Sequence, residues 1–225
     1  MAAKFQDPTP RLEEIYSRVE EVVKAFVDAG RRLYLVGGSV RDAVLGRHDA
    51  LPSGSDEDQP QQADFDFTTD ALPDEVERIV APHAKAMWLV GKRFGTVSAR
   101  VAGVTLEITT HRGDTYREES RKPEVVMGTS LEEDLLRRDF RINAMAVDFT
   151  AGRPFRVIDP FSGMADLVER MIRTPGAPEA SFSDDPLRMM RAARFAAQLG
   201  FDIDPAVLQA MRSMANRLEI VSRVR

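Results

Sequence analysis

The beginning of the chain alternates apolar and polar positions at helical spacing. Between Pro10 and Ala29, apolar residues recur every three or four positions, as they do in an amphipathic helix. Thr9 fits an N-cap before a first-turn proline, and Gly30 fits the position that ends a helix. We therefore predict a helix over residues 10–29. Its apolar face consists of Leu12, Ile15, Val19, Val22, Val23 and Phe26.

Strand patterns follow this helix. The short apolar run Leu33–Val36 predicts a strand, which leads through a Gly-Gly-Ser turn into a helix predicted over Val40–Leu45. Acidic and aromatic residues then alternate along Asp64–Thr68. A period of two predicts a strand with both aspartates on one face and both phenylalanines on the other.

The later patterns predict further strands and helices. Two strands are predicted over Met87–Val101 and Val104–Thr110, joined by a tight turn at Ala102-Gly103. Ile142–Phe149 is apolar without a period that separates helix from strand. Helices are predicted over 73–80, over 131–138 and from Pro186 onward, and a short strand is predicted over 156–158.

Two stretches have no apolar period. His48–Ala63 consists mainly of Gly, Pro, Ser, Asp, Glu and Gln, and Gly113–Ser130 is polar and charged. Such segments bury too little apolar surface to form a core, so both are predicted to be loops. The second loop is a candidate to close over a binding site.

These elements predict an α+β fold in two domains. We expect a small mixed sheet with flanking helices over residues 1–150, followed by an all-helical segment over 151–225. A chain of 225 residues is long enough for two domains. Ser222 fits the cap of a further helix, which indicates that the sequence is a piece of a longer protein.

Composition and charge restrict the location and the partners. There is no cysteine, which excludes disulfides and thiolate metal sites. No apolar run reaches the ~18 residues of a membrane span, and the N-terminus lacks the apolar core of a signal peptide, so we expect a cytoplasmic protein. The net charge of −5 argues against a nucleic-acid partner. Arginines nevertheless concentrate at Arg137, Arg138 and Arg141 and at Arg188, Arg191 and Arg194.

The first candidate site is the turn that follows the predicted strand 33–36. Gly37 and Gly38 let backbone N–H groups approach a ligand closely, and a helix begins at once with Ser39 and Arg41 in its first turns. The exposed N–H groups of a helix N-terminus favour phosphate oxygens. A tight turn that needs a positive φ explains the glycines equally well.

The second candidate site is the pair Asp64 and Asp66. Two carboxylates on one strand face, ~7 Å apart along the strand, can share hard cations such as Mg²⁺. Two such metals stabilise the attacking and leaving oxygens of an in-line displacement. A solvated acidic strand face is the commoner explanation for a lone Asp-x-Asp.

The third candidate is Glu107, which lies between Leu106 and Ile108 on a predicted strand. A carboxylate in an apolar setting needs a partner, and Glu107 could complete a trio of carboxylates around the metals. A strand whose other face is solvated is an equal alternative. A phosphate turn, an Asp-x-Asp strand and a later acidic strand are together typical of a nucleotidyltransferase.

Several ordered motifs resemble those of one family, the bacterial class II tRNA nucleotidyltransferases (CCA-adding enzymes) and the related poly(A) polymerases. The sequence departs from the family pattern in four places, none of which touches the aspartate pair. His48–Ala63 is longer than the family's usual gap, Arg141 replaces Thr, Gly163-Met164 replaces Gly-Gly, and Asp184 replaces Glu. The resemblance implies a polymerase-beta-like nucleotidyltransferase head followed by a helical neck. The motifs are Leu35–Asp42 with Asp64–Thr69, Gly91–Thr96, Arg137–Met145, Asp159–Leu167 and Asp184–Phe195.

The resemblance also implies roles for polar residues in the second half. Asp185 and Arg188 would select C or A by hydrogen bonds to the base edge, with Asp184 orienting them. An ordinary amphipathic helix explains the same pattern, with arginines on one face and Met189, Ala192, Ala193, Ala196 and Leu199 opposite. The further nucleotide-binding candidates are Arg138, Asp139, Asn143, Arg191 and Arg194.

By resemblance, the chain transfers CMP and AMP from CTP and ATP to the 3′ end of tRNA, with Mg²⁺ held by Asp64 and Asp66. Poly(A) polymerase is the main alternative, and a partial enzyme that adds only CC or only A is another. An inactive RNA-binding module is a third, which the intact Asp64, Asp66 and Glu107 disfavour. No membrane partner is expected, and the oligomeric state stays open.

Overall fold

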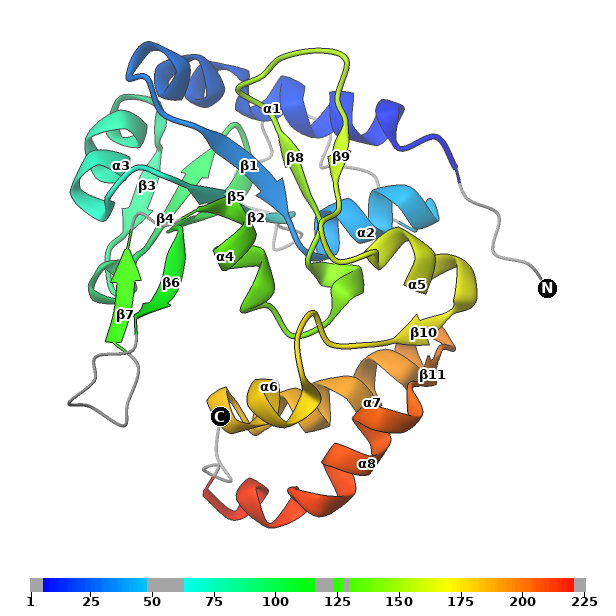
Figure 1. Ribbon diagram of the computed structural model, residues 1–225. Helices are drawn as coiled ribbons and strands as arrows, with labels where there is room; N and C mark the ends of the chain where they lie inside the picture. Colours follow the sequence, from blue (N-terminus) through cyan, green and yellow to red (C-terminus); the bar gives the residue numbers. More distant parts are fainter. Residues whose placement is uncertain (1–5, 48–62, 116–123, 128–129, 221–225) are drawn as a thin grey trace. The chain divides into compact units, whose positions relative to one another are not determined.

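The structure is a computed structural model that describes residues 6–47, 63–115, 124–127 and 130–220. It divides into two compact units (Figure 1). The first unit comprises residues 1–134 and 146–158, and the second comprises residues 135–145 and 159–225. The chain therefore crosses between the units three times, whereas a single boundary near residue 150 was expected.

The first unit is built on a seven-stranded sheet in the order β3-β4-β5-β2-β1-β8-β9. Only β2 and β5 run parallel, and the other neighbours are antiparallel, so the predicted mixed sheet is confirmed. The strands are β1 (Leu33–Val36), β2 (Asp64–Thr69), β3 (Ala86–Trp88), β4 (Thr96–Val101), β5 (Val104–Thr110), β8 (Ala146–Asp148) and β9 (Val157–Ile158).

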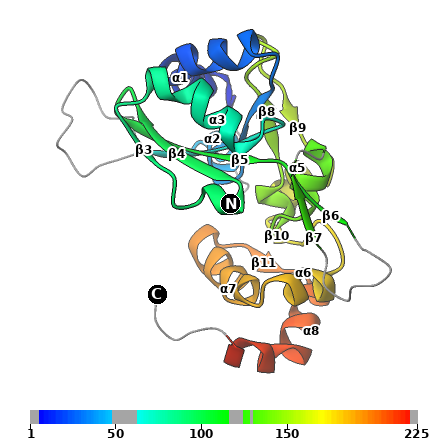
Figure 2. The ribbon, with the colours of Figure 1, turned by 90° about the vertical axis from the view of Figure 1, so that its left-hand side faces the viewer.

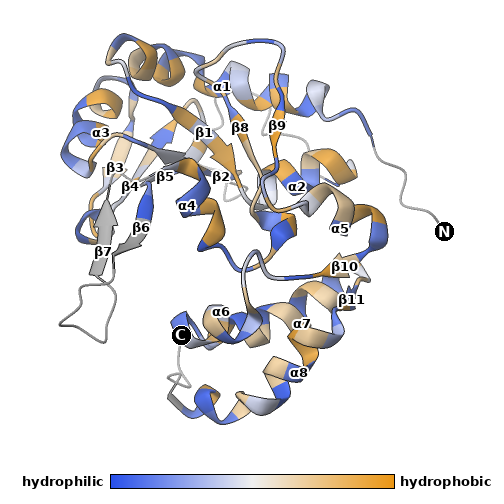
Figure 3. Cartoon of the chain, in the orientation of Figure 1, coloured by the Kyte–Doolittle hydropathy of each residue, from blue (hydrophilic) through white to orange (hydrophobic). Residues whose placement is uncertain are grey.

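Helices cover the apolar face of this sheet. Helices α1 (Thr9–Asp28) and α3 (Pro73–Val80) lie on the same side of it in Figure 2. Tyr16 of α1 packs edge-on against Phe149, which in turn packs against Phe67 of β2. All six predicted apolar residues of α1 are buried, which confirms its predicted face. Figure 3 shows β1 as an apolar strand, and it lies between β2 and β8 in the sheet.

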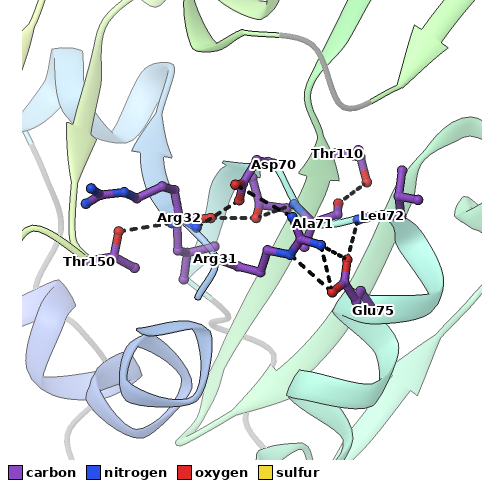
Figure 4. Close-up of polar contacts among 10 residues, drawn as sticks. Arg31, Arg32, Asp70, Ala71, Leu72, Glu75, Thr110 and Thr150 are labelled. Atoms are coloured by element: carbon purple, nitrogen blue, oxygen red, sulfur yellow. Dashed lines mark hydrogen bonds and ion pairs between the residues drawn. The ribbon is translucent and has the colours of Figure 1, made fainter. Parts of the chain in front are cut away.

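A network of polar contacts fixes one end of the central strands (Figure 4). Arg31 forms an ion pair with Glu75 at 2.9 Å, and the Arg32 N–H donates to the Asp70 carboxylate at 2.8 Å. The Thr110 hydroxyl at the end of β5 donates to the Ala71 carbonyl at 2.8 Å. These bonds tie the start of β1 to the ends of β2 and β5. They thus support the register of these three neighbouring strands.

Two segments of the first unit differ from their prediction, because each contains more elements than expected. The predicted strand 87–101 is wrong as a single element, because a 3₁₀ turn, η2 (Lys92–Phe94), separates β3 from β4. Gly95 has a φ of 87°, and a Cβ at Gly91 would lie 3.1 Å from the Thr96 carbonyl, so the chain turns sharply there. The predicted loop 113–130 contains a hairpin of β6 (Arg112–Thr115) and β7 (Glu124–Met127).

The ambiguous stretch 142–149 divides between the two units. η3 (Arg141–Asn143) belongs to the second unit, and β8 belongs to the first. Helix α2 (Gly38–Leu45) lies where a helix was predicted, and α4 (Leu131–Leu136) ends two residues earlier than predicted. Residues 48–62 of the first predicted loop, residues 116–123 of the second and the predicted cap Ser222 lie outside the described residues.

The second unit is mostly helical around a core of Phe182, Met189, Val207 and Ala210. It also contains a two-residue parallel ladder between β10 and β11, which the sequence pattern did not predict. Within the residues described, no helix combines the length and apolar composition needed to cross a membrane. The elements are α5 (Gly163–Glu169), β10 (Met171–Ile172), α6 (Pro178–Asp184), α7 (Leu187–Leu199), β11 (Asp202–Ile203), α8 (Pro205–Ser213) and η4 (Ala215–Ile220).

Candidate active site

The acidic strand β2 has the two faces that its period predicts. Phe65 and Phe67 are buried, and Asp64 and Asp66 are exposed on the opposite face. The parallel neighbour β5 places Glu107 directly opposite Asp66, and Glu107 is exposed as well. The structure therefore brings the three predicted carboxylates to one face of the sheet.

The carboxylates influence each other electrostatically. Partial burial raises the pKa of Glu107, and the charges of Asp66 and Asp64 raise it further. Like charges held this closely favour a cation between them. In the part of the chain that is described, no three imidazole or carboxylate groups are gathered closely enough to form a metal site. Metal binding by Glu107 stays a prediction.

The glycine turn lies beside this acidic face. Since Leu35 pairs with Phe67 in the antiparallel β1–β2 ladder, one further step places Val36 opposite Asp66. The chain then turns at Gly37, whose φ of 75° favours glycine, and α2 begins at Gly38. The positive φ of Gly37 therefore explains why glycine is needed at this turn. The N-terminus of α2 lies at the end of β2 that carries Asp64 and Asp66.

Arg41 does not extend from this turn into solvent. Its guanidinium is buried and donates to both carboxylate oxygens of Asp42 at 2.8 Å. A Cβ at Gly38 would lie 3.6 Å from the Arg41 Nη2, so the guanidinium packs beside the first turn of the helix. Ser39, two residues before Arg41, is half-buried. Phosphate binding by either side chain stays a prediction.

In the second unit, Asp139 is the centre of a polar cluster. Its Oδ1 accepts from the Phe140 N–H at 2.8 Å and from Asn143 Nδ2 at 3.0 Å. Its Oδ2 accepts from Arg191 Nε at 2.7 Å and Nη2 at 2.5 Å. Asp139 and Asn143 are both buried. Asp139, which is itself bonded by Asn143, thus holds Arg191 of α7. Direct contact of these residues with a nucleotide stays a prediction.

The two expected base-reading residues are held by contacts of their own. The Asp185 carboxylate accepts from the N–H of Leu187, the first residue of α7, at 3.0 Å. The Arg188 guanidinium donates to the Ser181 hydroxyl at 2.8 Å and to the Arg137 carbonyl at 2.5 Å. Ser181 and Arg137 therefore orient Arg188, the role expected of Asp184. No local sequence signal identifies Ser181, because its contact with Arg188 joins two different helices.

The buried stripe of α7 differs in part from the predicted one. Met189, Ala192 and Leu199 are buried as expected, but Ala193 is exposed and Phe195 is buried in its place. Phe195 packs edge-on against Phe140, and the exposed Arg194 lies with its guanidinium 5.0 Å from the Phe195 ring. Arg138 is half-buried between α4 and η3.

Known proteins resemble this chain along most of its length. The family model described as the poly A polymerase head domain matches residues 33–173. The CCA-adding enzyme of Lactobacillus helveticus is 37% identical over 213 residues, which cover 94% of this chain and 48% of that protein. The CCA-adding enzyme of Geobacillus thermodenitrificans is 45% identical over 175 residues, which cover 77% of this chain and 38% of that protein.

Solved structures agree with these relatives. A Bacillus stearothermophilus CCA-adding enzyme in complex with CTP has a TM-score of 0.74 at 36% identity, over 92% of this chain and 45% of that one. A tRNA nucleotidyltransferase complexed with a primer tRNA and an incoming ATP analog has a TM-score of 0.65 at 31% identity, over 87% and 50% of the two chains. The chain spans about half the length of the curated relatives it matches. On its fold and its sequence, the chain belongs to the poly(A) polymerase head domain family.

Proposed function

We propose that this chain is the catalytic part of a template-independent nucleotidyltransferase that adds CMP and AMP to the 3′ end of tRNA. The observation that carries the proposal is the pairing of Asp66 with Glu107, with Asp64 on the same strand face and the Gly37 turn at the same strand end. The relatives named above are CCA-adding enzymes, and two of their solved relatives hold CTP or a primer tRNA with an ATP analog.

The carboxylates fit Mg²⁺ by their chemistry. Asp64 and Asp66 offer hard oxygen ligands. Partial burial and, after it, the charges of Asp66 and Asp64 raise the pKa of Glu107, and a cation beside these groups would favour the charged form of all three. When bound there, Mg²⁺ would stabilise charge on the reacting phosphate and activate the attacking hydroxyl. Asp64 and Asp66 would be its ligands, and Glu107 is the candidate to complete the set.

The protein groups around the carboxylates would position the reactants. Backbone N–H groups of the turn at Gly37 and Gly38 and of the start of α2 would bind the triphosphate. The primer 3′ oxygen forms a bond to the α-phosphorus while that phosphorus loses its bond to the pyrophosphate oxygen. Pyrophosphate leaves, and the hydroxyl proton passes to water. Positioning and charge stabilisation supply nearly all the catalysis in such a transfer.

Selection of the base would come from the second unit. An Arg donates to ring nitrogens and carbonyls, and an Asp accepts from an exocyclic amine, so Arg188 and Asp185 suit cytosine and adenine. The cluster of Asp139, Asn143 and Arg191 would present a fixed cation to the sugar or the triphosphate. Arg138 and Arg194 are further candidates for phosphate contacts.

Poly(A) addition is the second candidate, because the family model that matches this chain is that of the poly A polymerase head domain. The two functions differ in the product made on tRNA that ends at its discriminator base. We expect C, C and A to be added when Mg²⁺, CTP and ATP are supplied, and sequencing of the products tests this. Long A tracts without C would establish poly(A) addition, and CC or A alone would establish a partial enzyme. Absence of product with every NTP would favour an inactive RNA-binding module.

A further inference from the structure

The acidic face of the sheet continues beyond the carboxylates toward its outer edge. In the β2–β5–β4–β3 ladder, Asp66 pairs with Glu107, Glu107 with Ser98, and Ser98 with Trp88. Paired residues on neighbouring strands point to the same face. Burial agrees with this, since Asp66, Glu107 and Trp88 are exposed and Ser98 is half-buried. We call these four residues the edge row.

The edge row is unlike the opposite face of the same strands. The opposite face carries the residues that come directly before Asp66, Glu107 and Ser98 in sequence. These residues, Phe65, Leu106 and Val97, are apolar and buried. Trp88 differs from the other three members of the edge row, because it is a large aromatic residue and is 46% exposed. An aromatic ring left exposed beside a polar row suits a partner that has both flat apolar faces and charge. A nucleic-acid strand has both of these.

The geometry of in-line transfer assigns this side to the primer. The strand order β4-β5-β2-β1 places the Gly37 turn on one side of Asp66 and Glu107 on the other. In phosphoryl transfer, the attacking oxygen and the leaving oxygen lie roughly in line on opposite sides of the phosphorus. If the triphosphate is bound by the Gly37 turn, the primer hydroxyl approaches from the Glu107 side. The primer strand then lies over β5, β4 and β3.

The dimensions agree with a short single strand. Neighbouring strands lie ~4.8 Å apart, so Trp88 is ~10 Å from Glu107 across the sheet. Stacked nucleotides rise ~3.4 Å each, and an unstacked strand extends further. A base of the last two primer nucleotides therefore reaches Trp88 while the 3′ oxygen is at Glu107.

One cation lies on the same strip. Arg100 of β4 pairs with Thr105, which pairs with Asp64, so Arg100 shares the face of the edge row one pair further along. Its guanidinium makes no hydrogen bond or ion pair with another residue that the structure describes. Arg100 is thus available to a backbone phosphate of a strand lying over β4.

We propose that Trp88 is the stacking platform for one of the last two bases of the RNA primer, with Arg100 binding the adjacent phosphate. This inference rests on the proposed function, because it assumes that the carboxylates carry out the transfer. It adds a primer subsite at the sheet edge that the roles discussed above do not include.

Trp88 is the single tryptophan of the chain, so its fluorescence reports on this position alone. The probe is a tRNA minihelix that ends at its discriminator base, titrated without nucleotide. We expect quenching that saturates with the RNA, that is lost when the last two nucleotides are abasic, and that CTP alone does not produce. Quenching by CTP alone would place Trp88 on the nucleotide side, and no quenching by the minihelix would also overturn the inference.

Steady-state kinetics test the same subsite. Trp88→Ala should raise KM for the primer ~5-fold or more while KM for CTP changes little, and Trp88→Phe should restore most of the loss. Arg100→Gln should reduce the slope of log affinity against log salt by about 0.7. Val90→Ala shortens a neighbouring exposed apolar side chain outside the edge row and should change neither KM. Equal effects of the Trp88 and Val90 changes would overturn the assignment.

The proposed function and this inference fail in different ways. If the unaltered chain transfers no nucleotide, the proposed function fails, whatever the fluorescence shows. If the unaltered chain transfers nucleotides and the Trp88 variants keep the normal KM for the primer, only the primer subsite fails.

Discussion

The guanidinium of Arg188 donates to the hydroxyl of Ser181 at 2.8 Å and to the Ser181 carbonyl at 3.3 Å. Ser181 lies on α6 and Arg188 on α7, so the contact joins the two helices on either side of Asp185. A guanidinium that reads a base must be held in one orientation, because its planar set of donors is directional. Ser181 is therefore a positioning residue for Arg188.

The first prediction follows from this contact. Ser181→Ala should leave the fold and the rate with CTP nearly intact, but it should raise incorporation of UTP and GTP relative to CTP and ATP. The reason is that Arg188 loses its 2.8 Å bond to the Ser181 hydroxyl and keeps only backbone carbonyls, those of Ser181 and Arg137, as partners. Competition between labelled nucleotides measures the ratio. Ser181→Thr should restore selectivity, and Ser183→Ala, on the same helix, is the matched control.

The second prediction concerns Arg188 itself. Arg188→Lys keeps the charge but loses the fork of donors, so selectivity among the four nucleotides should fall about tenfold or more. Binding of Mn²⁺, as a probe of the carboxylates, should not change, because those residues lie in the other unit. A variant that discriminates as well as the unaltered chain would reduce α7 to a structural helix.

The third prediction concerns the acidic pair. Asp66→Asn should lower transfer about 10³-fold or more, because charge stabilisation is most of the catalysis in phosphoryl transfer. Asp66 is exposed, so the thermal unfolding midpoint should stay nearly constant. Single-turnover product formation and a melting curve measure the two effects. Asp28→Asn, on exposed α1 surface, is the control, and near-normal turnover of Asp66→Asn would contradict the mechanism.

The fourth prediction concerns the packing of the second unit. A Cβ at Gly163 would lie 2.3 Å from the Arg141 carbonyl, which is backbone and cannot move aside easily. Gly163→Ala should therefore lower the free energy of unfolding by about 1–3 kcal/mol. Chemical denaturation measures it. Gly176→Ala meets only the Leu136 side chain at an ordinary 3.7 Å and should be nearly neutral.

Local periodicity was enough for the elements whose structure depends on near neighbours. The helix over α1 and the two faces of β2 followed from spacing alone, since a helix repeats every ~3.6 residues and a strand every two. The glycine turn was also predictable, because the positive φ of Gly37 strongly favours glycine. Asp64, Asp66 and Glu107 could thus be placed on strands from the sequence.

Long-range pairing decided the rest. That Glu107 lies opposite Asp66 depends on a parallel ladder whose register no short pattern specifies. Two antiparallel ladders, β5–β4 and β4–β3, then set the level of Trp88. The segment Leu135–Met145 joins the second unit because residues distant from it in sequence pack around it. Ser181 reaches Arg188 because α6 and α7, consecutive along the chain, fold against each other. Sequence periodicity states which face of an element is apolar. Which partner covers that face, and in which register, is settled by the packing of all elements at once, because each burial competes with every other.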